Sequence, residues 1–314
     1  MRVGTEPSPD DRVLLVCHIR AARGRARALA VAEVMALLRD TEPAPETGGP
    51  LAGERGIAWV SLAARRLGDV EPRLRRLGYV EAVDVTEPAT ANDRDVVRWR
   101  RRRWRLRRMH TDDPDRLREQ SPDRREFVLR TETGTRPVRG YRGSGGTFER
   151  RALPVVDARL LVNLAAPADR SGRLLDPFGG AGGIAVAAHD AGHVVFSGDR
   201  DTAVAAGLAV LTESRHVVAD AARLPHATAA FDAIATETPF EPAADDTIAR
   251  LLPELARVLA PGGRLAVMCA PRQAEIMNAG DTPLDVLVDE PVDRKGVPTR
   301  VLAWQRRSDA VVDA

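Results

Sequence analysis

The 314-residue sequence predicts a doubly wound α/β domain in its C-terminal half, preceded by a smaller α+β domain. Strands and helices alternate regularly from residue 148 onward. The first of these strands is followed directly by glycines, and acidic residues stand at the ends of successive strands. The length suits two domains, and the hydrophobic content of 44% is enough for a sizeable core in each.

The N-terminal domain is expected over residues 1–90, as a possible substrate- or RNA-binding unit. Its β-rich segments are 13–17, 57–62 and 79–85, and its helical segments are 23–39 and 70–77, the latter ended by Gly78. Residues 41–53, rich in Pro, Gly and Glu, are predicted to form a loop. This β-α-β-α-β order is typical of a small α+β unit.

A connecting segment rich in arginine is expected over residues 91–145. Between Arg94 and Arg108, nine arginines surround Trp99 and Trp104, a mixture that suits phosphate contacts together with base stacking. The alternative is an amphipathic, solvated strand in an arginine-biased protein whose only lysine is Lys295. Residues 127–130 are predicted to form a strand and residues 136–146 a linker.

Charge is distributed unevenly along the chain. Residues 1–150 hold 31 arginines and 23 acidic residues, a net charge of +8, whereas residues 151–314 carry a net charge of −6. This asymmetry favours a polyanion near the first half, and RNA is the partner that the arginine-rich segment indicates.

The catalytic domain is expected over residues 146–314. Its predicted strands are 173–178, 194–199, 216–220, 231–236, 263–270, 284–288 and 297–304, and its predicted helices are 157–166, 183–191, 202–211 and 247–259. Alternating strands and helices indicate a parallel sheet covered on both faces. The last two strands, joined by a turn at 293–296, are too close for a helical crossover and should pair antiparallel.

Glycine dominates the segment after the first of these strands, which reads Asp176-Pro177-Phe178-Gly179-Gly180-Ala181-Gly182-Gly183. In open α/β sheets, ligands bind outside the carboxyl ends of the strands. Glycine lets backbone approach a ligand closely, and a helix N-terminus directs amide groups toward it. A ligand site is therefore predicted at this turn.

Acidic residues follow the next two strands. Asp199 lies 23 residues after Asp176, and an acid at about that distance accepts hydrogen bonds from ribose hydroxyls. Asp220 lies 21 residues further on and could contact a base amino group, while Ala221 offers backbone atoms to an adenine ring. Three carboxylates at successive strand ends favour one ligand site over three separate helix caps.

The fourth strand ends in Thr236-Glu237-Thr238-Pro239-Phe240, where an acceptor would approach the ligand. Glu237 could hold an amino group and take its proton. Pro239 makes a stiff turn whose carbonyl is expected to be free to accept, and Phe240 could stack on a planar acceptor, a contact worth ~1–3 kcal/mol.

These motifs resemble those of class I S-adenosylmethionine-dependent methyltransferases. Six of the eight residues from Asp176 to Gly183 match the D-P-F-C-G-T-G-G motif of enzymes that modify nucleic-acid amino groups. More closely, residues 145–268 are similar to the archaeal-type tRNA guanosine-N2-methyltransferase or THUMP-associated RNA methylase family. The shared segments are the helix 157–164, Ser197-Gly198-Asp199-Arg200-Asp201, Asp220 with Leu224-Pro225, and Pro261-Gly262-Gly263.

The resemblance implies a Rossmann-like, seven-stranded methyltransferase sheet that binds S-adenosylmethionine. Gly180 and Gly182 would face the methionine part of the cofactor, Asp199 the ribose, and Asp220 with Ala221 the adenine. The remaining expected cofactor residues come from the matched segments and are Asp176, Pro177, Phe178 and Arg200.

The resemblance also implies N-methylation of an amino group on a tRNA-like base, with Glu237, Pro239 and Phe240 as the catalytic segment. The family's D-P-P-Y motif is replaced here by Glu237-Thr238-Pro239-Phe240, which keeps the acid, one proline and the aromatic type. A small-molecule or peptide acceptor and a non-catalytic cofactor- or RNA-binding protein therefore stay open as alternatives. A nicotinamide-dependent oxidoreductase fits less well, because the glycine-rich turn begins with Asp176-Pro177-Phe178.

Neither a metal site nor a membrane span is expected from the sequence. His189 and His193 have helical spacing without a third ligand nearby, and no apolar run approaches the roughly 20 residues that cross a bilayer. The polar N-terminus lacks a signal-peptide pattern, so a cytoplasmic location is expected. The sequence does not indicate the oligomeric state.

Overall fold

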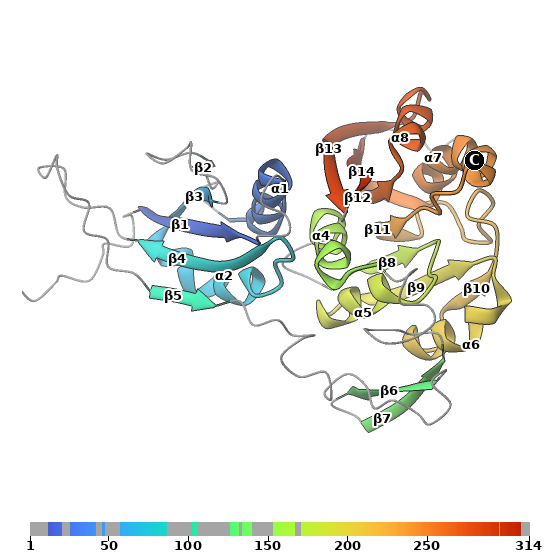
Figure 1. Ribbon diagram of the computed structural model, residues 1–314, viewed down its shortest axis with the longest axis horizontal. Helices are drawn as coiled ribbons and strands as arrows, with labels where there is room; N and C mark the ends of the chain where they lie inside the picture. Colours follow the sequence, from blue (N-terminus) through green and yellow to red (C-terminus); the bar gives the residue numbers. More distant parts are fainter. Residues whose placement is uncertain are drawn as a thin grey trace, which may run out of the picture. The chain divides into compact units, whose positions relative to one another are not determined.

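The computed structural model describes residues 12–20, 26–41, 46–47, 57–86, 102–105, 126–131, 134–139, 153–166, 171–294 and 296–308 (Figure 1). The chain divides into two compact units, Met1–Arg107 and Arg108–Ala314. This division falls inside the segment 91–145 that the sequence predicts as a connection. The predicted boundaries at residues 90 and 145 stay predictions.

The first unit is a five-stranded sheet with two helices. Its strands, in the order β2-β3-β1-β4-β5, pair antiparallel throughout. The strands are β1 (Arg12–Ile19), β2 (Glu46–Thr47), β3 (Ile57–Ala63), β4 (Val80–Thr86) and β5 (Arg102–Arg105). The helices are α1 (Arg27–Leu38) and α2 (Leu67–Leu74), the latter preceded by a 3₁₀ turn, η2 (Ala64–Arg66).

A buried carboxylate joins α1 to the start of β4. Glu33 is fully buried and accepts hydrogen bonds from the backbone N–H groups of Gly78 and Tyr79, at 2.6 and 2.9 Å. A buried carboxylate needs such donors because desolvation otherwise disfavours its charge. The contact therefore sets the position of the helix relative to the sheet.

The predicted α+β order of the first unit is confirmed, with small differences at element ends. The loop predicted over 41–53 contains the two-residue strand β2, which pairs with β3 at Ser61 and Val60. Residues 70–77 were predicted as helical, but α2 starts at Leu67 and ends at Leu74. Of the arginine-rich segment 94–108, the described part is β5, an edge strand paired with β4; residues 94–101 and 106–108 lie outside the described residues.

The second unit contains a seven-stranded sheet in the order β10-β9-β8-β11-β12-β14-β13. Its strands are β8 (Arg173–Asp176), β9 (Val194–Asp199), β10 (His216–Val218), β11 (Phe231–Glu237), β12 (Leu259–Cys269), β13 (Leu284–Arg294) and β14 (Val297–Arg306). The first five strands in this order are parallel, and β14 is antiparallel to both of its neighbours. The predicted seven-stranded sheet with an antiparallel final pair is confirmed.

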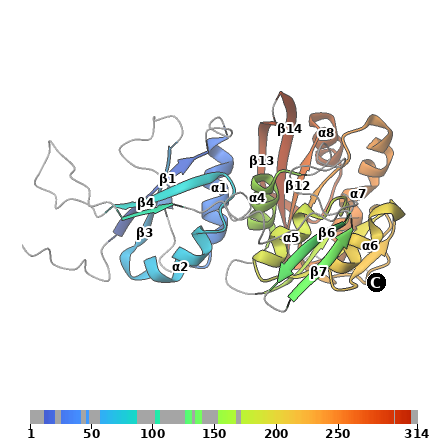
Figure 2. The ribbon, with the colours of Figure 1, turned by 60° about the horizontal axis from the view of Figure 1, so that its bottom comes forward.

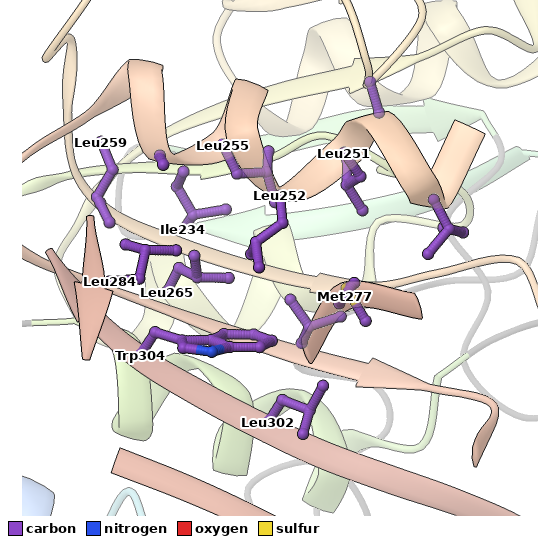
Figure 3. Close-up of a cluster of buried hydrophobic side chains, with 14 of the residues drawn as sticks. Ile234, Leu251, Leu252, Leu255, Leu259, Leu265, Met277, Leu284, Leu302 and Trp304 are labelled. Atoms are coloured by element: carbon purple, nitrogen blue, oxygen red, sulfur yellow. The ribbon is translucent and has the colours of Figure 1, made fainter. Parts of the chain in front are cut away.

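Helices cover both faces of this sheet (Figure 1). They are α4 (Val155–Ala165), α5 (Gly183–Asp190), α6 (Thr202–Leu211), α7 (Asp245–Val258) and α8 (Pro271–Asn278), with a 3₁₀ turn, η3 (Pro242–Ala244), before α7. Figure 3 shows α7 above the strands and a helix of the other layer, α4 by its colour, below them. The sheet is therefore doubly wound, as the sequence predicts.

The core between α7 and the sheet follows from the sequence pattern of α7. Ile248, Leu251, Leu252 and Leu255 recur at helical spacing and are buried in one cluster with Trp304, which is 2% exposed. Figure 3 shows Leu251, Leu252 and Leu255 on α7 and Trp304 on the sheet below. Asp245 and Asp246 lie in the first turn and Arg257 in the last, each at the helix end that favours its charge. The parallel strands against which α7 packs are themselves buried on both faces.

Two parts of the second unit differ from the sequence predictions. The predicted linker 136–146 overlaps the second part of β7 (Gly134–Arg139), which pairs with β6 (Glu126–Thr131) in a hairpin beside α6 (Figure 2). The linker prediction was wrong there because arginines and glycines do not prevent a ladder when a partner strand is adjacent. Helix α8 was not predicted, since its eight residues carry too short an apolar pattern.

The strand order reverses direction at β8, which has β9 on one side and β11 on the other. At such a switch point the connections leave in opposite directions and open a crevice outside the carboxyl ends of the strands. The fold thus brings the ends of β8, β9 and β11 to one place. Within the described residues, none of the helices has the length and apolar character needed to cross a membrane.

Candidate cofactor and acceptor site

A cavity of about 830 Å³ lies at the carboxyl ends of β8, β9 and β11. Its lining includes eight of the residues that the sequence singles out: Asp176, Phe178, Gly180, Asp199, Arg200, Glu237, Pro239 and Phe240. A cavity of this size is in the range of small-molecule and cofactor sites. The residues come from three separate strand ends, so the fold assembles the site that the sequence could only infer from spacing.

Two glycines of the turn after β8, Gly180 and Gly182, have different structural roles. Gly180 has a φ of +47° and lines the cavity, where a Cβ atom would meet only the Phe178 carbonyl oxygen, at 3.6 Å. Gly182, the N-cap of α5, has a φ of +82°, and a Cβ atom on it would overlap Cδ1 of Leu211. Gly180 therefore opens backbone to a ligand, whereas Gly182 is required by its backbone conformation and by packing against α6.

Asp199 connects the end of β9 to the glycine turn. Its Oδ2 accepts a hydrogen bond from the Gly180 N–H at 2.8 Å, and its Oδ1 accepts one from the Asp201 N–H at 2.8 Å. A carboxylate offers about four acceptor positions, so two backbone bonds leave capacity for two ligand hydroxyls. The side chain lines the cavity, which suits the ribose contact expected of it.

Asp176 is the most buried acid in the cavity lining, with 2% exposure. Its Oδ1 accepts hydrogen bonds from Oγ1 of Thr236 at 2.8 Å and from the Phe178 N–H at 3.3 Å. Burial raises the pKa of this carboxyl to about 7, and the two hydrogen bonds only partly offset that effect. Asp176 can therefore change its charge near neutral pH.

Four of the expected cofactor residues do not line the cavity. They are Pro177, Gly182, Asp220 and Ala221. Asp220 accepts a hydrogen bond from the Ala222 N–H at 3.0 Å and has its Oδ2 3.9 Å from Nη2 of Arg250, while Ala221 is 2% exposed within the hydrophobic core. The cavity thus includes Asp199, which is expected to hold the ribose, and does not include Asp220 or Ala221, which are expected at the adenine.

Glu237, at the end of β11, forms an ion pair through Oε1 with Nη1 of Arg294. The Nε atom of the same arginine is 3.5 Å from Oδ2 of Asp157, which lies fully buried on α4. Burial raises the pKa of Glu237 to about 7; Arg294 acts in the opposite direction, and the charge of Asp157 raises it further. Glu237 therefore belongs to a three-membered charged cluster.

The Pro239 carbonyl was expected to be free, and the structure shows that it is not. It accepts a hydrogen bond from Nε2 of Gln273 at 2.7 Å, and Oε1 of Gln273 accepts one from Oγ1 of Thr238 at 2.8 Å. Arg272 donates in addition to the Phe240 carbonyl oxygen at 2.5 Å. The N-terminus of α8 thus holds the loop after β11 rigidly, and Pro239 positions the loop without offering its carbonyl to an acceptor.

The sequence reasoning missed Arg294 and Gln273. Arg294 is the last residue of β13, 57 residues after Glu237, and no local pattern indicates that they meet. Gln273 lies on the unpredicted helix α8, and its complete burial is unusual for a glutamine. The one available signal was the Pro271 that begins α8, because proline is favoured at the first helical position.

The lining fits a cofactor that carries a ribose and a positive charge. Gly180 leaves room for close approach to the backbone, Asp199 has acceptor capacity left, and the first residues of α5, Gly183 and Ile184, line the cavity. The acids of the lining outnumber the arginines. They are Asp176, Asp199, Asp201, Glu237 and Glu241, against Arg200 and Arg294. Asp199 would hold the ribose, and the acidic lining would favour a sulfonium centre.

Comparison with known proteins identifies the kind of domain that holds this cavity. Residues 175–267, which run from β8 into β12, match a family model described as a methyltransferase domain. A search of curated proteins finds no match. Residues 175–267 thus carry a methyltransferase domain, and the chain is a methyltransferase that uses S-adenosylmethionine as its cofactor.

Solved structures with a similar arrangement include three at low sequence identity. TrmN from Thermus thermophilus is 19% identical, over 94% of this chain and 99% of that one, with a TM-score of 0.48. A TehB-like methyltransferase from Corynebacterium glutamicum is 20% identical, over 48% and 87%, with a TM-score of 0.39. The 1,6-didemethyltoxoflavin-N1-methyltransferase of Burkholderia thailandensis is 15% identical, over 60% and 98%, with a TM-score of 0.38.

The raised pKa of Asp176 predicts how the stability of the protein depends on pH. The folded state binds the Asp176 proton more tightly than the unfolded state, whose carboxyl titrates near 3.8. Stability should therefore fall as pH rises from about 4 to about 7, by about 1.4 kcal/mol per unit of pKa difference. Between pH 5 and 8, urea unfolding should show a loss roughly 2–4 kcal/mol larger in the wild type than in Asp176→Asn. Parallel stability curves for the two proteins would contradict the assignment.

Proposed function

We propose that this methyltransferase transfers a methyl group to an amino nitrogen, and that its natural acceptor is a base in an RNA of tRNA type. The position of Glu237 carries the proposal. Its carboxylate lies at the end of β11, in the same cavity as Asp199 and Gly180, so acceptor and cofactor would share one space. A carboxylate whose pKa is about 7 suits proton removal at neutral pH.

The roles of the residues follow from this arrangement. The cofactor supplies an electrophilic methyl group, so the protein's main task is to align the acceptor. Glu237 would accept a hydrogen bond from the acceptor amino group and help to remove its proton. Phe240 would stack on a planar acceptor. The loop that carries both is held by Gln273 and Arg272 of α8, which preserves their spacing.

An RNA acceptor is supported by the first unit. Its sheet ends in β5, whose sequence is Arg102-Arg103-Trp104-Arg105, and β5 has one strand partner, β4, among the described strands. An edge strand rich in arginine, with an aromatic residue among them, is suited to phosphate contacts and base stacking. The net charge of +8 on residues 1–150 favours the same class of partner.

A small molecule with an amino group is the second candidate. The observation that favours it is the excess of acidic residues in the cavity lining, because such a lining repels phosphates and favours an amine. In this case the arginines of the first unit would have no part in binding the acceptor.

The test is transfer of label from methyl-labelled S-adenosylmethionine into a whole-cell extract, followed by separation of RNA, protein and small molecules. We expect label in the RNA fraction, in nucleosides methylated on an amino group, with the purified wild-type protein. The double variant Asp199→Ala, Glu237→Gln serves as the blank, since it removes the ribose contact and the acceptor contact together.

The other outcomes decide between the remaining candidates. Label in small molecules alone would replace the RNA proposal by the second candidate. Label in the protein fraction alone would indicate a peptide acceptor. Intact binding of S-adenosylmethionine with no label in any fraction would contradict the proposed methyl transfer to an amino group and favour a binding protein.

A further inference from the structure

The two oxygens of the Glu237 carboxylate have different surroundings. Oε1 is paired with Arg294, whereas Oε2 has no hydrogen-bond partner within the described residues. The side chain is 20% exposed and lines the cavity beside Phe240. One oxygen is therefore held by the protein, and the other is left for a ligand.

Arg294 reaches Glu237 because a β-hairpin brings it there. It is the last residue of β13, and the turn into β14 contains Gly296 with a φ of +87°, whose N–H donates to Oδ1 of Asp293 at 2.7 Å. The guanidinium carbon lies 5.9 Å from the centre of the Phe240 ring, and Nη1 is 3.6 Å from Sδ of Met268. Strand β12, the loop after β11 and the hairpin together fix the guanidinium.

We propose that Arg294 is a positioning residue for the methyl acceptor: together with buried Asp157 it holds Oε1 of Glu237, and thereby directs Oε2 to the N–H of an uncharged, planar amine stacked on Phe240. The inference deepens the proposed function and rests on it. It assigns the acceptor a class, an aromatic amine without positive charge, because a protonated nitrogen has no lone pair with which to attack the methyl group, and a planar ring can stack on Phe240.

The charged groups around Glu237 make the proposal measurable. Arg294 comes from β13, Asp157 from α4 and Asp176 from β8, and Arg272 of α8 is paired with Asp245 next to the same loop. Arg294 lowers the pKa of Glu237, and Asp157 raises it. Removal of the Arg294 charge should therefore raise the pKa of Glu237, and removal of the Asp157 charge should lower it. General damage to the fold would not produce opposite shifts.

The experiment is a pH titration of the full-length protein, without cofactor, labelled with ¹³C at glutamate carboxyl carbons. The Glu237 signal is identified by its loss in Glu237→Gln. We expect Arg294→Met to raise the apparent pKa of Glu237 by about one unit or more, since an opposite charge nearby shifts a carboxyl pKa by 1–3 units. Asp157→Asn should lower it, and Arg294→Lys, which keeps the charge, should stay close to the wild type.

Arg300→Met is the matched control. Arg300 lies on β14 of the same hairpin and pairs with Asp289, but it does not line the cavity. This variant should leave the titration of Glu237 unchanged. An unchanged Glu237 titration in folded Arg294→Met, or an equal shift in Arg300→Met, would overturn the proposal. Should Asp157→Asn fail to fold, the comparison of Arg294→Met with Arg294→Lys still decides the point.

Activity on the acceptor gives the second measurement. Arg294→Met should lower kcat/KM by about 100-fold at neutral pH, the scale of loss that a small misplacement causes, and should shift the pH profile upward with the NMR value. Arg294→Lys should recover part of the loss. If the Glu237 pKa shifts as expected in the NMR titration but no extract contains an acceptor, the ion pair is established and the proposed function is refuted. Failure of the ion-pair proposal and failure of the proposed function are therefore distinguishable.

Discussion

Replacement of Asp199 by alanine is expected to weaken the binding of S-adenosylmethionine by about 100-fold or more. Asp199 lines the cavity, and its carboxylate retains acceptor capacity after bonding the backbone N–H groups of Gly180 and Asp201. Two lost hydrogen bonds to a charged acceptor, each worth about 1.5–3 kcal/mol, account for a loss of that size. The affinity is measured by isothermal titration calorimetry with S-adenosylmethionine and its demethylated product.

Asp220→Ala is the comparison for this experiment, since both acids follow neighbouring strands. Asp220 is exposed and does not line the cavity, so its replacement should cost less than about ten-fold in affinity. Circular dichroism should show that both variants stay folded. Equal losses in the two variants would mean that the adenine end of the site extends to Asp220, and an unchanged affinity in Asp199→Ala would remove Asp199 from the cofactor site.

Replacement of Gly182 by alanine is expected to destabilise the second unit by about 2–5 kcal/mol. A φ of +82° costs an L-residue about 1–2 kcal/mol, and the new Cβ atom would overlap Cδ1 of Leu211, which adds an overpacking cost of about 1–3 kcal/mol. Because Gly182 is the N-cap of α5, the amide groups that face the cavity should also be displaced. Urea unfolding measures the first effect and cofactor affinity the second.

Gly192→Ala separates the two contributions. Gly192 follows α5 with a φ of +84°, yet a Cβ atom on it would meet no other atom within 4 Å, so its replacement should cost only the backbone strain of about 1–2 kcal/mol. Cofactor affinity should be unchanged in this variant. A destabilisation of Gly182→Ala no larger than that of Gly192→Ala would show that Leu211 moves away without cost.

The fold could be predicted because its signals are local. The helix period of α7, the continuous apolar runs of the parallel strands and the glycines after β8 depend on neighbours within a few residues. The antiparallel end of the sheet followed from a short connection, since two strands separated by a tight turn have no other way to pair. Elements with a weak local signal, such as α8 and β7, were not recognised.

Local patterns of strands and turns were enough to predict which acids stand at strand ends. The contacts of the site residues follow from the fold alone: Glu237 pairs with Arg294, and the Pro239 carbonyl accepts a hydrogen bond from Gln273. Partners separated by 57 and 34 residues come together through the sheet order and the packing of α8 and the hairpin. Such contacts depend on distances in space, on which the spacing of residues along the chain carries no information.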